Sequence, residues 1–264
     1  MWLASVDGAI APAAEARIPV ADDGLLRGDG GFEVIRVYDG VPFAWDEHLE
    51  RLRRTCAGLR LPVDIEAFRA EAEAVVAQAR EAESLLRLVV TRGGRRLAIV
   101  EPLPVRGATA RVATVTYAPT RVLNGLKTLS YAGNVLAVRL AQERGYDEAL
   151  LVTPHGRVLE GPTWTFFWVA DGRLSTPPLS EGILDSITRR KLLAACDVEE
   201  RTCTLDDLRA AQEAFIASTV REVMPIVAVD EIELPAAPGP VTRSAHEAFR
   251  ALLGRELGSA DRFT

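Results

Sequence analysis

Lys127 and Glu160 are the two residues whose types and spacing point most directly to chemistry. Lys127 lies just before a strongly patterned helical segment, and Glu160 follows 33 residues later at the end of a strand pattern. A lysine amine can form a Schiff base with an aldehyde, and a carboxylate can keep a pyridine nitrogen protonated. Pyridoxal phosphate chemistry requires both groups. A lysine taken alone, however, is usually a solvated surface residue.

A phosphate ester also needs fixed donors, which arginine and the first N–H groups of a helix supply. The chain offers such donors at three separated places: Arg51 on a predicted helix, Ile187 and Thr188 at the start of another, and Ser218 with Thr219 at the end of a strand. Taken singly, each has an ordinary structural explanation as a surface cation, a helix start or a strand end. Only their conjunction with the lysine and the carboxylate favours a phosphate site.

Composition fits a protein that acts on small metabolites. The 264 residues are 48% hydrophobic, enough to bury a sizeable core in one large or two medium domains. The net charge is −6 and the arginines are scattered, so nucleic acid is not an expected partner. No apolar run approaches the 18 or so residues that span a membrane, and the N-terminus lacks a basic region before a long apolar stretch. We therefore expect a cytoplasmic location without membrane insertion.

The cysteines give no sign of a disulfide framework or a metal site. Cys56, Cys196 and Cys203 are odd in number, form no Cys-x-x-Cys pair and lack a histidine at ligand spacing. We interpret them as reduced thiols and expect no bound metal.

The first 116 residues are predicted to form a small α+β domain. Residues 32–45 form a predicted hairpin around the turn Asp39-Gly40. Asp46 can cap the helix that follows, and a second helix is predicted over 65–83. Three further strands are predicted, at 85–91, 96–101 and 110–116.

Residues 117–125, which include a proline, are predicted to connect this domain to a second one over 126–264. The second domain begins with a helix over 130–144 whose expected buried stripe consists of apolar side chains: Val135, Leu136, Val138 and Leu140. The other predicted strands are at 148–153, 157–160, 165–170, 173–176 and 214–218. Three further helices are predicted: one at 187–196 capped by Ser186, a short one that begins at a capping box of Thr204 and Asp207, and one at 245–257.

In this order the motifs resemble those of the class IV, or fold type IV, pyridoxal-phosphate aminotransferases, which include D-amino acid and branched-chain aminotransferases and aminodeoxychorismate lyases. The matching stretches cover nearly the whole chain: 27–36, 48–52, 127–137, 147–151, 159–161, 176–189 and 218–225. The resemblance implies an α+β fold with a small α/β N-terminal domain and a larger C-terminal domain with a β-barrel-like core.

The resemblance also implies the roles of individual residues. Lys127 would form the Schiff base with pyridoxal 5′-phosphate and shuttle the substrate proton, and Glu160 would pair with the pyridinium nitrogen. The phosphate would be held by the donors named above: Arg51, Ile187, Thr188, Ser218 and Thr219. Tyr131 would either approach the phenolic oxygen of the cofactor or pack in the core.

Several departures from the D-amino acid aminotransferase pattern affect the expected substrate site. Phe32 replaces a tyrosine, and the Arg-x-His that helps to trap a substrate carboxylate is missing. Arg95 or Arg96 would then bind the carboxylate alone, or else both arginines only belong to a solvated turn. Trp164 replaces a small polar residue after Glu160 and would reshape the pocket. We include Val34, on the same strand as Phe32, among the expected substrate residues.

The resemblance leaves three hypotheses for function. The first is a transaminase that moves an amino group from D-amino acids or (R)-amines to a 2-oxo acid. The second is a 4-amino-4-deoxychorismate lyase that releases pyruvate, and the third is a non-catalytic binding protein of the same fold. The branched-chain subgroup fits least, because it carries Gly-Gly-Asn-Tyr where this chain has 128–131 as Thr-Leu-Ser-Tyr. As in the family, a homodimer is expected.

Overall fold

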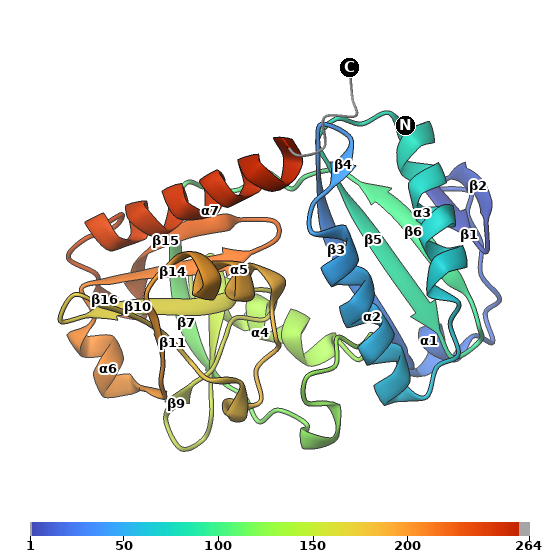
Figure 1. The fold of residues 1–264 in the computed structure, drawn as a ribbon. Helices are drawn as coiled ribbons and strands as arrows, with labels where there is room; N and C mark the ends of the chain where they lie inside the picture. The colour runs from blue at the N-terminus through green and yellow to red at the C-terminus, as the bar shows by residue number, and fades with distance from the viewer. Residues whose placement is uncertain (1, 259–264) are drawn as a thin grey trace. The chain divides into compact units, whose positions relative to one another are not determined.

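The computed structural model describes residues 2–258, which divide into two compact units (Figure 1). The first unit comprises residues 2–105, the segment Leu126–Tyr131 and residues 256–258. The second comprises Arg106–Gly125 and Ala132–Arg255. The predicted domain ranges also include residues 1 and 259–264, which lie outside the described part of the chain.

The first unit contains a six-stranded antiparallel sheet in the order β2-β1-β6-β5-β3-β4. Its strands are β1 (Leu3–Val6), β2 (Ala9–Pro12), β3 (Gly30–Tyr38), β4 (Val41–Pro42), β5 (Ser84–Thr91) and β6 (Arg96–Glu101), and its helices are α1 (Asp23–Arg27), α2 (Trp45–Leu59) and α3 (Ile65–Ala79). The predicted hairpin is confirmed, with Asp39 and Gly40 at positive φ in the turn. The hairpin of β1 with β2 and the short helix α1 were not predicted.

The core of the first unit lies between the sheet and the helices α2 and α3, which cover one of its faces (Figure 1). Leu49 and Leu52 of α2 and Phe68 of α3 pack there against Ile35 of β3. The capping role predicted for Asp46 is wrong. The N-cap lies two residues earlier, at Ala44, which has a left-handed conformation and forms no side-chain cap, and Asp46 lies in the first turn.

The segment 126–131 lies along the open edge of β3 within the same unit. Thr128 forms an antiparallel bridge with Gly31, and Leu129 N donates to Gly30 O at 2.8 Å. The segment can pair with the N-terminal end of β3 because β4 pairs only with Val37 and Tyr38, at the other end of the strand. The other edge of β3 is paired with β5. The backbone around Lys127 is therefore fixed by β3 as though it were a short additional strand.

The second unit contains a ten-stranded mixed sheet in the order β12-β11-β10-β14-β15-β7-β8-β9-β13, with β16 paired to β15. Its strands are β7 (Ala110–Thr116), β8 (Glu148–Val152), β9 (Arg157–Val158), β10 (Thr165–Ala170), β11 (Arg173–Thr176), β12 (Val198–Glu200), β13 (Cys203–Thr204), β14 (Glu213–Ser218), β15 (Glu222–Val229) and β16 (Ile232–Glu233). The strand β7 was predicted to belong with the first domain, but it is parallel to β8 and β15 in this sheet. The eight-residue strand β15 was missed altogether.

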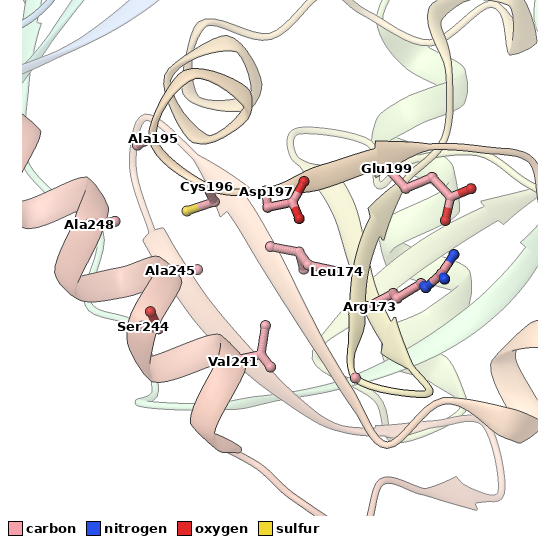
Figure 2. Close-up of a pocket in the computed structure, with 11 residues that line it drawn as sticks. Arg173, Leu174, Ala195, Cys196, Asp197, Glu199, Val241, Ser244, Ala245 and Ala248 are labelled. Atoms are coloured by element: carbon pink, nitrogen blue, oxygen red, sulfur yellow. The ribbon is translucent and has the colours of Figure 1, made fainter.

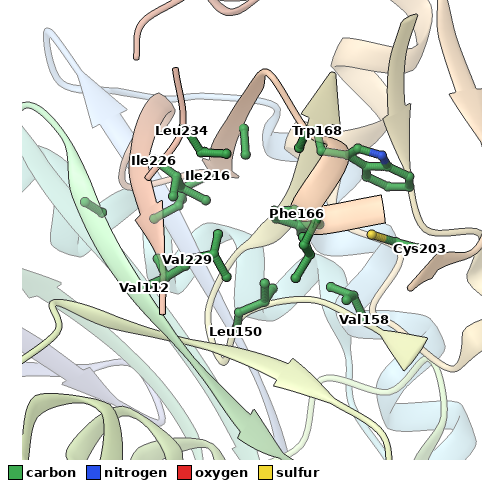
Figure 3. Packing of buried hydrophobic residues seen from close by; sticks show 14 of the residues in the cluster. Val112, Leu150, Val158, Phe166, Trp168, Cys203, Ile216, Ile226, Val229 and Leu234 are labelled. Carbon is green, nitrogen blue, oxygen red and sulfur yellow. The ribbon is translucent and has the colours of Figure 1, made fainter. Parts of the chain in front are cut away.

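The sheet of the second unit curls around its own hydrophobic core. Phe166 and Trp168 of β10 belong to the same buried cluster as Val158 of β9 and Cys203 of β13 (Figure 3). These strands lie several positions apart in the sheet order, and strands lie ~4.8 Å apart in a flat sheet. Their side chains meet only because the sheet is strongly curved, as in a barrel-like core.

The helices of the second unit are η1 (Arg121–Leu123), α4 (Ala132–Glu143), η2 (Leu179–Glu181), α5 (Ile187–Ala195), α6 (Leu205–Ala210) and α7 (Pro240–Gly258). The expected buried stripe of α4 is wrong. The helix buries the small side chains Ala137 and Ala141 beside β7 and β8, whereas Val135, Leu136 and Leu140 are exposed. Among the described residues, no helix combines the length and apolar character needed to cross a membrane.

Candidate functional site

Lys127 is held by backbone contacts on two sides. Its N–H donates to the buried Thr55 hydroxyl of α2 at 3.2 Å, and its carbonyl accepts from Phe32 N at 2.9 Å. Its Nζ lies 4.5 Å from the centroid of the Phe32 ring, a favourable cation–π distance. The backbone of the lysine is thus fixed while its amine lies against an aromatic surface.

Phe32 also contacts two other chemically interesting side chains, those of Tyr131 and Arg87. Tyr131 meets its ring edge-on at 5.3 Å, and Arg87 Cζ lies 5.8 Å from its centroid. Arg87 pairs in register with Val34, and side chains alternate along a strand, so Phe32, Val34 and Arg87 leave the sheet on one face. The role of Tyr131 at the cofactor stays a prediction, and packing is its observed contact.

Arg51 is buried on α2 and is engaged by Glu33 of β3. Its Nε and Nη2 donate to the two Glu33 oxygens at 2.7 and 2.6 Å, and His48 Nδ1 lies 2.8 Å from Glu33 Oε2. Burial acts to raise the pKa of the Glu33 carboxyl, but the charge and hydrogen bonds of Arg51, with His48, hold it at about 2. Burial lowers the pKa of His48. Because an ionised carboxylate can only accept, His48 donates to Glu33 through Nδ1.

Glu160 lies in the second unit, in the loop after β9. Its Oε1 accepts from Leu184 N at 3.0 Å, which ties the carboxylate to the residues that lead into α5. Burial raises the pKa of the nearby Tyr117, and the charge of Glu160 adds to this effect. An ionised carboxylate held in this way is an acceptor for a protonated ring nitrogen.

The start of α5 presents backbone donors three residues after Leu184, whose N–H donates to Glu160. Ser186 is the N-cap, as predicted, and its hydroxyl accepts from Arg189 N at 3.4 Å. Ile187 and Thr188 follow in the first turn and are both buried. Ser218 ends β14, on which α5 packs, and its hydroxyl accepts from Arg221 N in the turn that contains Thr219.

The sequence-predicted residues are thus distributed over both units. The first unit holds Lys127, Arg51, Tyr131, Phe32, Val34, Arg95 and Arg96, and the second holds Glu160, Ile187, Thr188, Ser218, Thr219 and Trp164. Within the first unit, the structure brings Lys127, Phe32 and Tyr131 together.

Arg95 and Arg96 already have carboxylate partners. Arg95 Nη1 donates to Asp7 at 2.6 Å, and the Arg96 guanidinium binds both oxygens of Glu71. The hydrogen bond to Glu71 is the main cause of the raised pKa of Arg96. These pairs fasten the turn between β5 and β6, so we do not assign a substrate to either arginine.

Trp164 lies in the hydrophobic core of the second unit and is 3% exposed. Its Nε1 donates to Glu148 at 3.3 Å, and a Cβ added to Gly161 would lie only 1.9 Å from the indole. The indole therefore shapes the turn after Glu160 from inside the core, and we do not propose that it contacts substrate.

Four polar residues of the Lys127 region were not predicted as site residues. They are Glu33, His48, Thr55 and Arg87. A signal was present in the sequence, because His48, Arg51 and Thr55 follow one another at intervals of three and four residues. This spacing puts them on one face of α2, next to the apolar stripe.

The second unit also has a surface cavity of about 630 Å³ (Figure 2). It is lined by residues of β11, the end of α5, β12 and α7, among them Arg173, Asp197 and Glu199. None of the sequence-predicted site residues lines it. The described residues contain no group of three or more histidine, cysteine or acidic side chains arranged to hold a metal ion.

The donor set fits pyridoxal phosphate. An amine for the aldehyde, a carboxylate for the ring nitrogen, and buried N–H and hydroxyl groups at a helix start for the phosphate are all present. In addition, His48 Nε2 is buried and has no hydrogen-bond partner among the described residues. A buried polar atom of this kind usually has a water or ligand beside it.

The chain is similar to known proteins over most of its length. Residues 30–229 match the family described as amino-transferase class IV. A putative branched-chain-amino-acid aminotransferase of Methanocaldococcus jannaschii is 35% identical, covering 89% of this chain and 91% of that protein. The D-alanine aminotransferase of Bacillus licheniformis is 31% identical, covering 92% and 94%. The fold IV transaminase CpuTA1 from Curtobacterium pusillum superposes with a TM-score of 0.85 at 29% identity, covering 95% and 99%.

The fold and the donor set define a fold type IV enzyme of pyridoxal phosphate. The chain belongs to the class IV aminotransferases, and its cofactor is pyridoxal 5′-phosphate. The hypothesis of a non-catalytic binding protein is therefore set aside. The branched-chain relative also removes the reason for ranking that subgroup last.

Proposed function

We propose that this aminotransferase takes its amino group from D-amino acids, and also from (R)-arylalkylamines, and transfers it to pyruvate or 2-oxoglutarate. The observation that carries the proposal is the Phe32 ring beside the Lys127 amine, whose Nζ lies 4.5 Å from the ring centroid. A phenyl ring in place of a phenol leaves room for an apolar group beside the reacting amine, whereas the nearby Arg87 guanidinium already donates to both oxygens of Glu101. The similarity to D-alanine aminotransferases supports the D-stereochemistry.

The residues divide the work as follows. Lys127 binds the cofactor covalently and moves the proton between the substrate Cα and the cofactor. Glu160 keeps the ring nitrogen protonated, while Arg51, the start of α5 and the turn after β14 hold the phosphate. The bound cofactor supplies an electron sink for the charge left when the Cα proton departs.

A second candidate is transamination of branched-chain L-amino acids, which the 35% identical relative favours. A direct test mixes the purified holoenzyme, one compound at a time, with D-alanine, D-glutamate, L-leucine, L-valine and (R)-1-phenylethylamine. The absorbance change from the aldehyde form to the amine form of the cofactor reports each half-reaction. Conversion by L-leucine and L-valine alone would replace the first candidate by the second.

The lyase hypothesis is tested in the same experiment. Aminodeoxychorismate is added to the holoenzyme without an amino acceptor, and the pyruvate released is measured with lactate dehydrogenase. Fast pyruvate release, together with no spectral change for any amino acid or amine, would establish a lyase instead of a transaminase.

We also propose a homodimer. The helix α4 begins five residues after Lys127 and exposes three large apolar side chains: Val135 (40% exposed), Leu136 (52%) and Leu140 (40%). Clustered apolar side chains on one exposed helix are typical of a protein interface.

A further inference from the structure

Glu33 is a fully buried carboxylate on a strand face that otherwise serves the hydrophobic core. Side chains alternate along β3, so Glu33 leaves the sheet on the side of Ile35 and Val37, both 0% exposed. That side is covered by α2. A charge in such a position is strongly unfavourable unless it is paired and hydrogen-bonded.

The pairing of Glu33 is complete and directional. One oxygen accepts from Arg51 Nε at 2.7 Å, and the other accepts from Arg51 Nη2 at 2.6 Å and from His48 Nδ1 at 2.8 Å. A guanidinium is planar and a carboxylate is planar, so two parallel hydrogen bonds fix both the position and the rotation of the arginine group. His48 in turn fixes the carboxylate from a second direction.

We propose that Glu33 is a positioning residue, which holds the Arg51 guanidinium in the orientation that binds the cofactor phosphate, with His48 bracing the carboxylate. The inference rests on the phosphate-binding role proposed above for Arg51. The bidentate pair uses Nε and Nη2 of the rigid, planar guanidinium, so Glu33 sets the orientation of the whole group, its other N–H groups included. The buried Nε2 of His48, which has no partner among the described residues, places a further polar atom at this cluster.

Two effects of removing the Glu33 charge oppose each other. Loss of a carboxylate beside Arg51 makes the region more positive, which alone would strengthen phosphate binding. Glutamine keeps the shape of glutamate but offers only one oxygen, and its NH₂ group would face an N–H of the guanidinium, so the pair would separate. We expect the loss of orientation to outweigh the gain in charge, because a misdirected donor no longer forms a short charged hydrogen bond.

The experiment compares two ligands that differ only in the phosphate. Apoenzyme is titrated with pyridoxal 5′-phosphate and with pyridoxal, and both dissociation constants are measured by absorbance and tryptophan fluorescence. For Glu33→Gln we expect affinity for the phosphorylated ligand to fall about tenfold, as when an orienting partner is lost at a metal site. Affinity for pyridoxal should stay within about twofold.

Matched variants separate positioning from a loss of folding. Glu71→Gln loosens another arginine pair of the first unit, that with Arg96, and should leave the ratio of the two dissociation constants unchanged. His48→Asn retains a donor for Glu33 and should preserve the ratio better than His48→Leu. Thermal unfolding of each apoenzyme identifies variants that fail to fold. If Glu33→Gln fails to fold, the comparison of His48→Asn with His48→Leu provides the test.

The outcome for Arg51→Ala distinguishes the two proposals. If that variant leaves the ratio unchanged, the phosphate role of Arg51 itself is wrong. If Arg51→Ala changes the ratio and folded Glu33→Gln does not, or tightens binding of the phosphorylated ligand, the positioning role is overturned. In the Arg51→Ala background, Glu33→Gln should have little further effect on the ratio, because residues that act through one another are not additive.

Discussion

At the scale of single residues, the cofactor attachment is the sharpest point to test, because the chain contains only two lysines, Lys127 and Lys191. Borohydride reduction of the yellow holoenzyme should leave the phosphopyridoxyl label on Lys127, as read by peptide mass spectrometry. Lys127→Ala should fold but lose turnover, since it removes both the covalent link and the proton carrier. Lys191→Ala is the matched control and should keep the label; a label on Lys191 in the wild type would contradict the assignment.

Glu160 should affect the chemical step more than cofactor binding. In Glu160→Gln the neutral amide no longer favours a protonated ring nitrogen, so removal of the Cα proton should be slowed by at least about 100-fold. Stopped-flow half-reactions with Cα-deuterated substrate measure this step, and the dissociation constant of the cofactor should change little. If Glu160→Gln instead lost its cofactor as Arg51→Ala is expected to, the division of roles between the two residues would be wrong.

The Glu33 carboxyl links stability to pH with a definite sign. Its pKa in the folded protein is lowered from 4.5 to about 2, which corresponds to about 3 kcal/mol of stability. This contribution is fully present above pH 4.5 and is lost as the pH falls through about 2. Urea unfolding of apoenzyme should therefore show the difference between wild type and Glu33→Gln shrinking from pH 6 to pH 3. A difference that grows on acidification would contradict the lowered pKa.

At the scale of elements, α5 combines an ordinary helix cap with a proposed ligand site. Ser186→Ala removes the cap and should lower the free energy of unfolding by about 1 kcal/mol. It should also weaken binding of pyridoxal 5′-phosphate, because the N–H groups of the first turn lose their alignment. Thr204→Ala, which removes the cap of α6, should cost similar stability without changing cofactor affinity. Equal effects on affinity in both variants would mean that the site does not use α5 specifically.

The elements that were predicted correctly carry strong local signals. The Asp39-Gly40 turn, the Ser186 cap and the box of Thr204 with Asp207 each need only a few neighbouring residues. The start of α2 was misplaced because Asp46 resembles a cap in sequence, whereas the chain enters the helix through Ala44. The strand β15 was missed because Pro225 in its middle argues against a strand, although the ladder with β14 accommodates it.

At the scale of the whole molecule, the exposed apolar residues of α4 should mediate assembly. Leu136→Asp should shift the protein from dimer to monomer in light scattering coupled to size exclusion, because a charge placed in an apolar interface is desolvated without a partner. Leu205→Asp changes an exposed leucine on α6 and is the matched control. A wild-type protein that is monomeric, or an undisturbed Leu136→Asp dimer, would remove α4 from the interface.

The sequence by itself determined the lysine and carboxylate pair, the family that these motifs resemble, and the elements with strong local periodicity. Motif residues are recognisable in a sequence because the chemistry of the cofactor demands particular side chains, and helix caps and tight turns are encoded by neighbouring residues.

Only the tertiary structure decided which distant segments meet. Residues 110–116 form a strand by local pattern, but their partners β8 and β15 follow much later in the chain, so no local signal could assign them to a sheet. The helix α4 has apolar residues on more than one side, and packing against β7 and β8 selects its alanine face. Likewise, Glu33 is an unremarkable strand residue in sequence, and it becomes the partner of Arg51 only because α2 covers β3.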